Sequence, residues 1–453
     1  MPPNTPRWHA LQLLNALEAR HVTLDALLDE RRESIDALDR RDRALMQALV
    51  YGVLRWRPRL DAIIAACLSK PGHRMAPDIR NILRLGILQL GILDRIPPSA
   101  AVHTAVELTR ETGKKPLTGF VNAVLRKAQR EGVDALLPLS TADPTASLAL
   151  THAMPEWMAA RWLERFGPVE AQTFCQAMNT EAPLIGRVNS LKTTREAVAA
   201  ELAVAGMSAT PTPVSPDGLI LANVNVPISK VSAIARGELR IQDEGAQLVV
   251  QLLDPQPGER VLDACAGLGG KTGHIAQRMN NRGGILAIDG DPRRLKQLAA
   301  DMPKLGVNCV DTRRLDLNRP ILSDAAASFD RVLLDAPCSG MGVIRRNPDT
   351  KWARRPEDLS RYAERQRRFL DHLAPLVKSS GVLVYAVCSL EPEENMQVIA
   401  DFLNHHPAFS LRPPPASLDF HRHGLVDEDG CFRSTPHRHG MDGFFAATLI
   451  RMA

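Results

Sequence analysis

The chain has 453 residues, a length typical of two or three domains, and its formal net charge of +5 is mild. No run of 18 or more apolar residues is present, which excludes a membrane-spanning helix. Seven cysteines without a CxxC pair argue against a disulfide framework and against a zinc site. The N-terminal sequence MPPNTPRWHALQLL has no features of a secretory signal, so we expect a cytosolic protein.

Positive charge is concentrated in the first third of the chain. Residues 1–140 hold 21 Lys and Arg against 15 Asp and Glu, whereas the remainder holds 35 against 36. A basic region of this kind suggests an anionic partner, most commonly nucleic acid. A helical surface with a surplus of arginine would give the same count, and charge alone does not decide between the two.

The region from residue 7 to about 130 predicts a compact all-α domain, because apolar residues recur at helical spacing. The segment 79–93 is apolar on nearly all sides, so we place it at the domain centre. We expect the helices to break at Pro58, Pro71-Gly72, Pro97-Pro98 and Gly113.

Residues 131–145 lose this periodicity and predict a linker. Two further helices are expected next, and then a strand at 182–194, a helix at 194–206 and a strand at 218–224. These elements predict a small α+β module over residues 146–238. The expected organisation is therefore a helical domain at 1–140, this module, and a third domain at 239–453.

From Leu239 onward, strands alternate with helices of similar length. That alternation predicts a doubly wound, mostly parallel α/β sheet of the Rossmann-like type.

A glycine-rich loop joins the first strand of this domain to its helix, in the sequence DACAGLGGKT at 263–272. Glycines permit tight turns and close approach of a ligand to the main chain. Asp289 ends the next strand, where a carboxylate can accept hydrogen bonds from a ribose diol, and Asp316 follows the strand after that. The spacing predicts an adenosine-containing ligand rather than a structural turn.

The loop matches neither GxGxxG nor GxxxxGK[ST], which disfavours NAD and a nucleoside triphosphate. S-adenosylmethionine (SAM) needs no phosphate cradle, so SAM is the expected cofactor. No metal is needed for SAM chemistry. The pairs His421/His423 and His437/His439 lack a surrounding ligand framework, and we expect no metal there.

Two apolar strands lead into a cysteine, at 329–338 with Cys338 and at 382–388 with Cys388. Asp335 lies just before the first cysteine. A single such cysteine is most often an inert buried thiol. Two at equivalent strand ends of one sheet, with a carboxylate beside them, predict convergence on one pocket.

A methyl donor and a thiol in one pocket fit methylation at C5 of a pyrimidine. The thiolate adds to C6, C5 then takes the methyl group, and loss of the C5 proton expels the thiolate. Asp335 is expected to protonate or hydrogen-bond the N3/N4 edge and so to select cytosine. Either cysteine could attack on this reasoning.

The sequence resembles the RNA cytosine-C5 methyltransferases of the NOL1/NOP2/Sun family. The resemblance covers roughly residues 150–451 and rests on DACAGLGGK, ILAIDGD, LLDAPCSGMGVIRRNPDTKW and VYAVCSLEPEEN. The helical front end resembles the NusB-like RNA-binding domain. This combination implies an enzyme that methylates one cytosine in 16S rRNA and has RNA as its partner. The default expectation for its oligomeric state is a monomer.

The resemblance also implies residue roles. Cys388 becomes the nucleophile and Cys338 the helper in product release, with Asp335 at the target base. The implied SAM-contacting residues are Cys265, Ala266, Gly267, Leu268, Gly269, Gly270, Lys271, Asp289, Asp316 and Asp335. The family loop usually reads APGGK, and the departure to AGLGGK predicts a more flexible loop with lower SAM affinity.

Basic residues cluster just after Cys338. We expect them to hold RNA phosphates, although they could also form a solvated helix face; they are Arg345, Arg346, Lys351, Arg354, Arg355, Arg361, Arg365, Arg367 and Arg368. Two alternative functions stay open. One is the same chemistry on tRNA, and the other is a non-catalytic RNA-binding assembly or antitermination factor.

Overall fold

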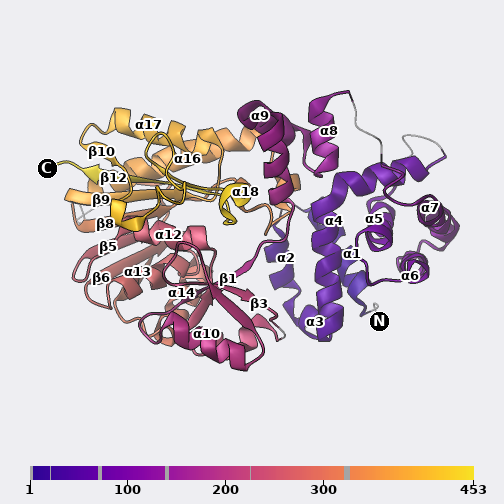
Figure 1. Cartoon of the computed structure of the whole chain (residues 1–453), viewed down its shortest axis with the longest axis horizontal. Coiled ribbons are helices and arrows are strands. Elements are labelled where there is room, and N and C mark those ends of the chain that lie inside the picture. Colours follow the sequence, from indigo (N-terminus) through magenta and orange to yellow (C-terminus); the bar gives the residue numbers. More distant parts are fainter. Residues whose placement is uncertain (1–3, 21, 70–73, 138–141, 225, 321–326) are drawn as a thin grey trace. The chain divides into compact units, whose positions relative to one another are not determined.

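The computed structural model describes residues 4–20, 22–69, 74–137, 142–224, 226–320 and 327–453. They form two compact units (Figure 1). The helical unit is Met1–Thr180 with Ile344–Arg354, and the α/β unit is Glu181–Val343 with Arg355–Ala453. The expected break at Pro71-Gly72 and part of the expected linker lie outside the described residues. The boundaries of three domains stay a prediction.

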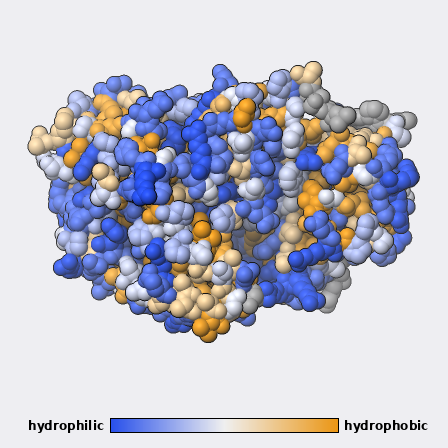
Figure 2. All heavy atoms as spheres, viewed as in Figure 1, coloured by the Kyte–Doolittle hydropathy of each residue, from blue (hydrophilic) through white to orange (hydrophobic). Residues whose placement is uncertain are grey.

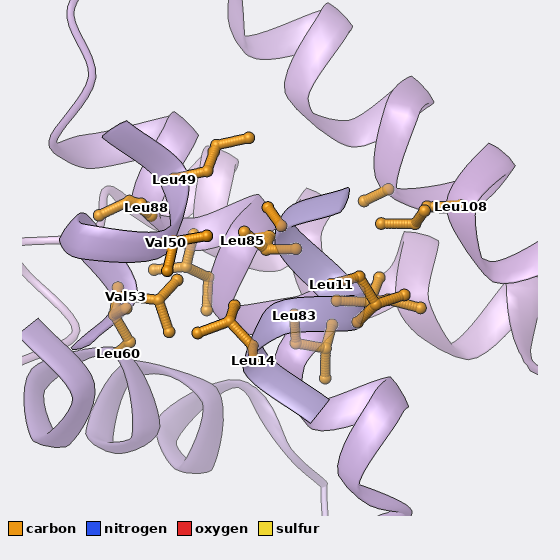
Figure 3. Packing of buried hydrophobic residues seen from close by; sticks show 14 of the residues in the cluster. Leu11, Leu14, Leu49, Val50, Val53, Leu60, Leu83, Leu85, Leu88 and Leu108 are labelled. Carbon is orange, nitrogen blue, oxygen red and sulfur yellow. The ribbon is translucent and has the colours of Figure 1, made fainter. Parts of the chain in front are cut away.

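Helix α5 (Pro77–Gly91) is the core helix of the helical unit, as its apolar sequence predicted. Leu83, Leu85 and Leu88 are at most 1% exposed. They pack with leucines and valines of the neighbouring helices (Figure 3). Those helices are α1 (Pro6–Ala19), α4 (Arg40–Cys67), α6 (Pro98–Glu111) and α7 (Thr118–Glu131). The short helices are α2 (Leu24–Glu30), α3 (Arg32–Asp36) and α8 (Pro144–Thr151), and the longer α9 (Glu156–Met178) is kinked.

The break predicted at Pro58 is wrong, because α4 runs through this residue. Proline has no N–H, so the carbonyl of Leu54, four residues earlier, loses its helical donor. The indole Nε1 of Trp352 donates to that carbonyl at 2.7 Å instead. A segment nearly 300 residues away in the sequence therefore satisfies the acceptor that the proline leaves open, and the helix continues.

Lys351 lies beside this contact, in the short helix α15 (Thr350–Ala353). Its Nζ donates to Arg55 O at 3.0 Å, Ala153 O at 3.0 Å and Asn179 Oδ1 at 2.8 Å. The residue is 1% exposed. A buried ammonium group is costly unless it is hydrogen-bonded, so these three acceptors give Lys351 a structural role within the helical unit.

Residues 184–241 form a four-stranded antiparallel sheet in the order β2-β3-β1-β4. The predicted strands and helix are confirmed as β1 (Leu184–Val188), β3 (Gly218–Ala222) and α10 (Arg195–Val204). The strands β2 (Ser208–Pro211) and β4 (Leu239–Ile241) are too short to give a periodic signal. Connecting segments hold η2 (Ile228–Lys230) and α11 (Ser232–Ala235).

The larger sheet has the order β10-β12-β9-β8-β5-β6-β7, with β11 paired to β12. Strands β9, β8, β5, β6 and β7 are parallel, and β12 and β10 add antiparallel pairs at one side. The mostly parallel α/β prediction is confirmed. The strands are β5 (Arg260–Ala264), β6 (Gly284–Asp289), β7 (Val310–Arg314), β8 (Phe329–Asp335), β9 (Val377–Val387), β10 (Phe409–Arg412), β11 (Phe432–Ser434) and β12 (Phe444–Arg451).

Helices cover both faces of this sheet (Figure 1). One face carries α12 (Glu244–Leu253), α13 (Gly270–Arg278) and α14 (Pro292–Lys304). The other carries α16 (Pro356–Leu373) and α17 (Met396–His405). Strand order reverses between β5 and β8, which is the position where doubly wound sheets bind ligands.

Across the described ranges, no helix combines the length and apolar character needed to cross a bilayer. The face in Figure 2 is largely hydrophilic, with apolar residues scattered over it.

Candidate active site

A cavity of about 660 Å³ opens at the carboxyl ends of β5, β6, β8 and β9. Its wall contains every site residue predicted from the sequence except Gly269. Arg365, predicted only for RNA contact, also lines the wall. The remaining wall residues were not predicted from the sequence; they are Gln242, Asp263, Gly290, Asp291, Arg294, Leu315, Leu317, Ala336, Pro337 and Phe369. Asp291 could have been found from its place beside the strand-end Asp289. Phe369 follows the apolar periodicity of α16 and reads as a core residue.

The glycine loop turns sharply between β5 and α13. Cys265, Gly267 and Gly269 have φ values of 61°, 56° and 75°, in the left-handed region that glycine tolerates best. A Cβ on Gly269 would lie 2.6 Å from Leu298 Cγ, so this position requires glycine. Gly267 N donates to Asp289 Oδ2 at 2.9 Å, and this bond fixes the centre of the loop. The lower SAM affinity expected from the altered loop stays a prediction.

The start of α13 is anchored from the small antiparallel sheet. Arg187 on β1 is fully buried, donates to Gly270 O at 2.7 Å and also bonds the side chain of Gln242. Burial lowers the pKa of Arg187 to about 9. No motif in the sequence marks this arginine, because its role depends on two segments that pack together only in the fold.

Asp263 supplies a test of whether the cavity fits SAM. Its Oδ2 accepts from Thr272 Oγ1 at 2.6 Å, while its buried Oδ1 has no hydrogen-bond partner among the described residues. Burial raises the pKa of Asp263 to about 7. An ammonium group on a ligand would satisfy the open oxygen and favour the carboxylate. The amino acid end of SAM carries such a group.

Asp289 ends β6 and Asp316 follows the neighbouring strand β7, and both lie at the cavity wall. Asp289 Oδ1 accepts from Asp291 N at 2.8 Å, which orients the carboxylate. The exposed Asp316 accepts from Asn318 N at 3.0 Å, and this bond holds the pKa of Asp316 below its usual range. Both are therefore positioned to accept hydrogen bonds from a ligand.

The two predicted cysteines do converge. Strands β8 and β9 are parallel neighbours, and the Sγ atoms of Cys338 and Cys388 lie 3.3 Å apart at the cavity wall. The hydrogen bond with Cys388, together with burial, raises the pKa of the Cys338 thiol well above its ordinary value. Cys338 is therefore a thiol that retains its proton, within hydrogen-bond distance of Cys388 Sγ.

Lys271 and Asp335 form an ion pair across the same wall. Lys271 Nζ donates to Asp335 Oδ2 at 2.6 Å, and the ammonium also lies 5.7 Å from the centre of the Phe444 ring. The pair links the first turn of α13 to the end of β8. It offers a donor and an acceptor to a polar ring edge in the cavity.

The predicted basic cluster does not act as one surface. Arg345 and Lys351 are 4% and 1% exposed, so the prediction that they bind RNA phosphates is wrong. Arg365 lies in the cavity wall, with its guanidinium 5.1 Å from the Phe369 ring centre. Arg355, Arg361 and Arg368 are exposed. Among the described residues no group of three or more His, Cys, Asp or Glu side chains is placed to hold a metal ion.

Three family models match the chain in succession. They are the NusB family over residues 4–130, the ferredoxin-like domain of RsmF/B-like methyltransferases over 154–228, and 16S rRNA methyltransferase RsmB/F over 250–450. Similarity to solved structures spans the same length. PH0851 aligns with a TM-score of 0.81 and 26% identity, covering 99% of this chain and 98% of that one. A methyltransferase homologue from Pyrococcus horikoshii aligns with a TM-score of 0.59 and 28% identity, covering 69% and 100%.

Curated relatives match over nearly the whole chain. Identity is 35% over 443 residues, 97% of each protein, with the probable ribosomal RNA small subunit methyltransferase B of Bacillus subtilis. It is 36% over 451 residues, 99% of each protein, with ribosomal RNA small subunit methyltransferase B of Pseudomonas putida. The chain therefore belongs to the ribosomal RNA small subunit methyltransferase B (RsmB, Sun) family, whose cofactor is SAM.

Proposed function

We propose that this protein methylates C5 of one cytosine in 16S rRNA, with SAM as methyl donor and a transient bond between Cys388 and C6. The observation that carries the proposal is the placement of two thiols, 3.3 Å apart, in the cavity that also contains the glycine loop and Asp289. A donor pocket without a nucleophile would serve many methyl acceptors. A strand-end thiolate beside it favours a carbon that needs activation.

The reaction at C5 of the cytosine proceeds in three steps. The Cys388 thiolate adds to C6, and the electron pair of the C5–C6 double bond moves toward C5, which becomes enamine-like. SAM, when bound, supplies an electrophilic methyl group for C5. Removal of the C5 proton by a base then restores the double bond and expels the thiolate. The ion pair of Lys271 and Asp335 is suited to the N3/N4 edge, where a hydrogen bond stabilises the adduct.

The resemblance to the NOL1/NOP2/Sun enzymes supports Cys388 as the nucleophile, and its Sγ lies at the cavity wall 3.3 Å from Cys338 Sγ. The hydrogen bond with Cys388 and burial raise the pKa of Cys338, which suits a thiol that keeps its proton. Cys338 is left to assist the release of the product. The target base has to leave its stack, because C5 and C6 are attacked from the faces of the ring.

Asp289→Ala should weaken SAM binding by about 10- to 100-fold, since a charged acceptor at the ribose and an anchor of the Gly267 amide are both lost. Calorimetric titration with SAM measures the change. Asp311→Ala, an exposed aspartate on β7 outside the cavity, is the matched control and should bind SAM as the wild type does. Equal affinity in the two variants would contradict the cofactor site.

The substrate is tested by competition between RNA classes. The protein is incubated with SAM carrying a CD₃ methyl group and with either 16S rRNA or tRNA from cells lacking the modification. The RNA is then digested to nucleosides, which are analysed by mass spectrometry. We expect CD₃-labelled 5-methylcytidine from 16S rRNA alone, in keeping with the names of the relatives. Label in tRNA alone would show that tRNA is the substrate and that the assignment to 16S rRNA is wrong. No label together with no SAM binding would favour an RNA-binding assembly factor.

A further inference from the structure

Each of the two cysteines is followed by a buried serine, and the two serines meet at one carboxylate. Ser339 and Ser389 are both 0% exposed. Ser339 Oγ donates to Glu394 Oε2 at 2.5 Å, and Ser389 Oγ donates to the same oxygen at 2.6 Å. Glu394 lies in η5 (Pro392–Glu394), just after the Cys388 turn, and is also 0% exposed.

The other carboxylate oxygen holds the backbone around Cys338. Glu394 Oε1 accepts from Ser339 N at 2.8 Å and from Gln366 Nε2 at 3.0 Å. The same Gln366 nitrogen donates to Pro337 O at 3.1 Å. The residues on both sides of Cys338 are therefore tied to Glu394, one directly and one through Gln366.

Glu394 is itself fixed from the sheet. Tyr385 on β9 donates through its hydroxyl to Glu394 O at 2.7 Å. Burial raises the pKa of Glu394, and the donors from Ser339, Ser389 and Gln366 oppose that rise by stabilising the charged form. The residue does not line the cavity, so neither SAM nor a base in the cavity would contact it. Its side chain instead contacts the two cysteine turns through Ser339 and Ser389.

We propose that Glu394 is a positioning residue that fixes the separation and aim of Cys338 and Cys388 by clamping the serine after each. The proposal rests on the proposed function, in which one thiol attacks and the other assists release. The turns that carry Cys338 and Cys388 follow different strands, and no covalent bond fixes their relative position. The shared buried carboxylate of Glu394 fixes this relative position. A displacement of a catalytic group by about 1 Å can lower the reaction rate by about 100-fold.

We call Glu394 with its hydrogen bonds to Ser339 and Ser389 the clamp, and it predicts different outcomes for two substitutions of Glu394. Glu394→Ala removes the acceptor of four hydrogen bonds, so both turns relax and kcat should fall by about 100-fold. SAM affinity should stay at the wild-type level, because Glu394 lies outside the cavity wall. Glu394→Gln keeps one acceptor oxygen, and the two serine hydroxyls can rotate to accept from its amide. This variant should recover most of the lost rate.

A readout without RNA tests the geometry directly. Diamide oxidises two nearby thiols to a disulfide and is itself reduced to the hydrazine, with both thiol protons transferred to its nitrogens. Peptide mass spectrometry then follows formation of the Cys338–Cys388 bond over time. We expect rapid bonding in the wild type, several-fold slower bonding in Glu394→Ala, and near wild-type bonding in Glu394→Gln. Glu364→Gln, an exposed glutamate on α16, is the control and should not change the rate.

The outcomes separate the clamp from the proposed function. If Glu394→Ala bonds its thiols and methylates RNA at the wild-type rate, the clamp is wrong. If the wild type methylates no RNA but the disulfide rate still falls in Glu394→Ala, the clamp stands and the proposed function fails. If Glu394→Ala does not fold by circular dichroism, Ser389→Ala takes its place. That variant removes one donor and should slow bonding to a smaller extent, and an unchanged rate would overturn the clamp.

Discussion

Cys388→Ala should abolish methyl transfer, with a loss of about 10⁴-fold or more in kcat, as expected when a covalent nucleophile is removed. Without the thiolate no adduct forms at C6, and C5 stays unreactive toward the methyl donor. Transfer of CD₃ groups to 16S rRNA under single-turnover conditions measures the loss. SAM binding should change little, because the glycine loop and Asp289 are untouched.

Cys309→Ala is the matched control for this experiment. Cys309 is a half-buried cysteine of the same unit, lies outside the cavity wall and should retain full activity when replaced. Should Cys388→Ala methylate normally while Cys338→Ala loses the adduct, the two thiols would have exchanged roles. Should both variants stay active, carbon activation by a cysteine would be wrong.

The second large effect is on stability. Lys351→Met should destabilise the helical unit by about 3 kcal/mol, because three buried oxygens, including the carbonyls of Arg55 and Ala153, lose their donor. All five tryptophans of the chain lie in this unit, so tryptophan fluorescence during urea unfolding reports on it. Lys127→Met is the control. Its exposed amine reaches a single carbonyl, and the cost should stay below about 1 kcal/mol.

The cost of Lys351→Met should also depend on pH. Burial lowers the pKa of Lys351 to about 7 in the folded chain, whereas an unfolded lysine titrates near about 10.4. Between these values the unfolded state binds more protons, so the contribution of Lys351 to stability rises with pH from about 7 to about 10.4 and is lost as pH falls back toward 7. The stability difference between wild type and Lys351→Met should thus be larger at pH 9 than at pH 7. An unchanged difference would mean that the folded amine stays charged.

Much of the α/β unit was predictable from the sequence. The alternation of apolar strands and amphipathic helices is local, and it fixes which residues end each strand. Since β8 and β9 are parallel, the cysteines that follow them had to reach one edge. The glycine loop and Asp289 were predicted in the same way, from their positions at the ends of predicted strands. The all-round apolar segment 79–93 likewise marked the core helix of the helical unit.

The wrong predictions and the residues missed in the sequence share one physical cause. Pro58 interrupts a helix by local rules, but Trp352 supplies the missing donor from a distant segment. Lys351 reads as a surface charge in sequence, yet three oxygens from separate elements enclose it. Arg187 and Glu394 escaped notice for the same reason. Each acts through partners that only the tertiary fold brings together, and single-sequence periodicity carries no information about such partners.

The central claim is the bond between Cys388 and C6 of the target cytosine. It is tested most directly by incubating Cys338→Ala with SAM and unmethylated 16S rRNA, digesting both polymers, and sequencing the peptide that carries a nucleotide. Since release is impaired in this variant, we expect an accumulated adduct on Cys388 that contains a methylated cytosine. An adduct on another residue, or methylated rRNA formed at full rate with no trapped peptide, would contradict it.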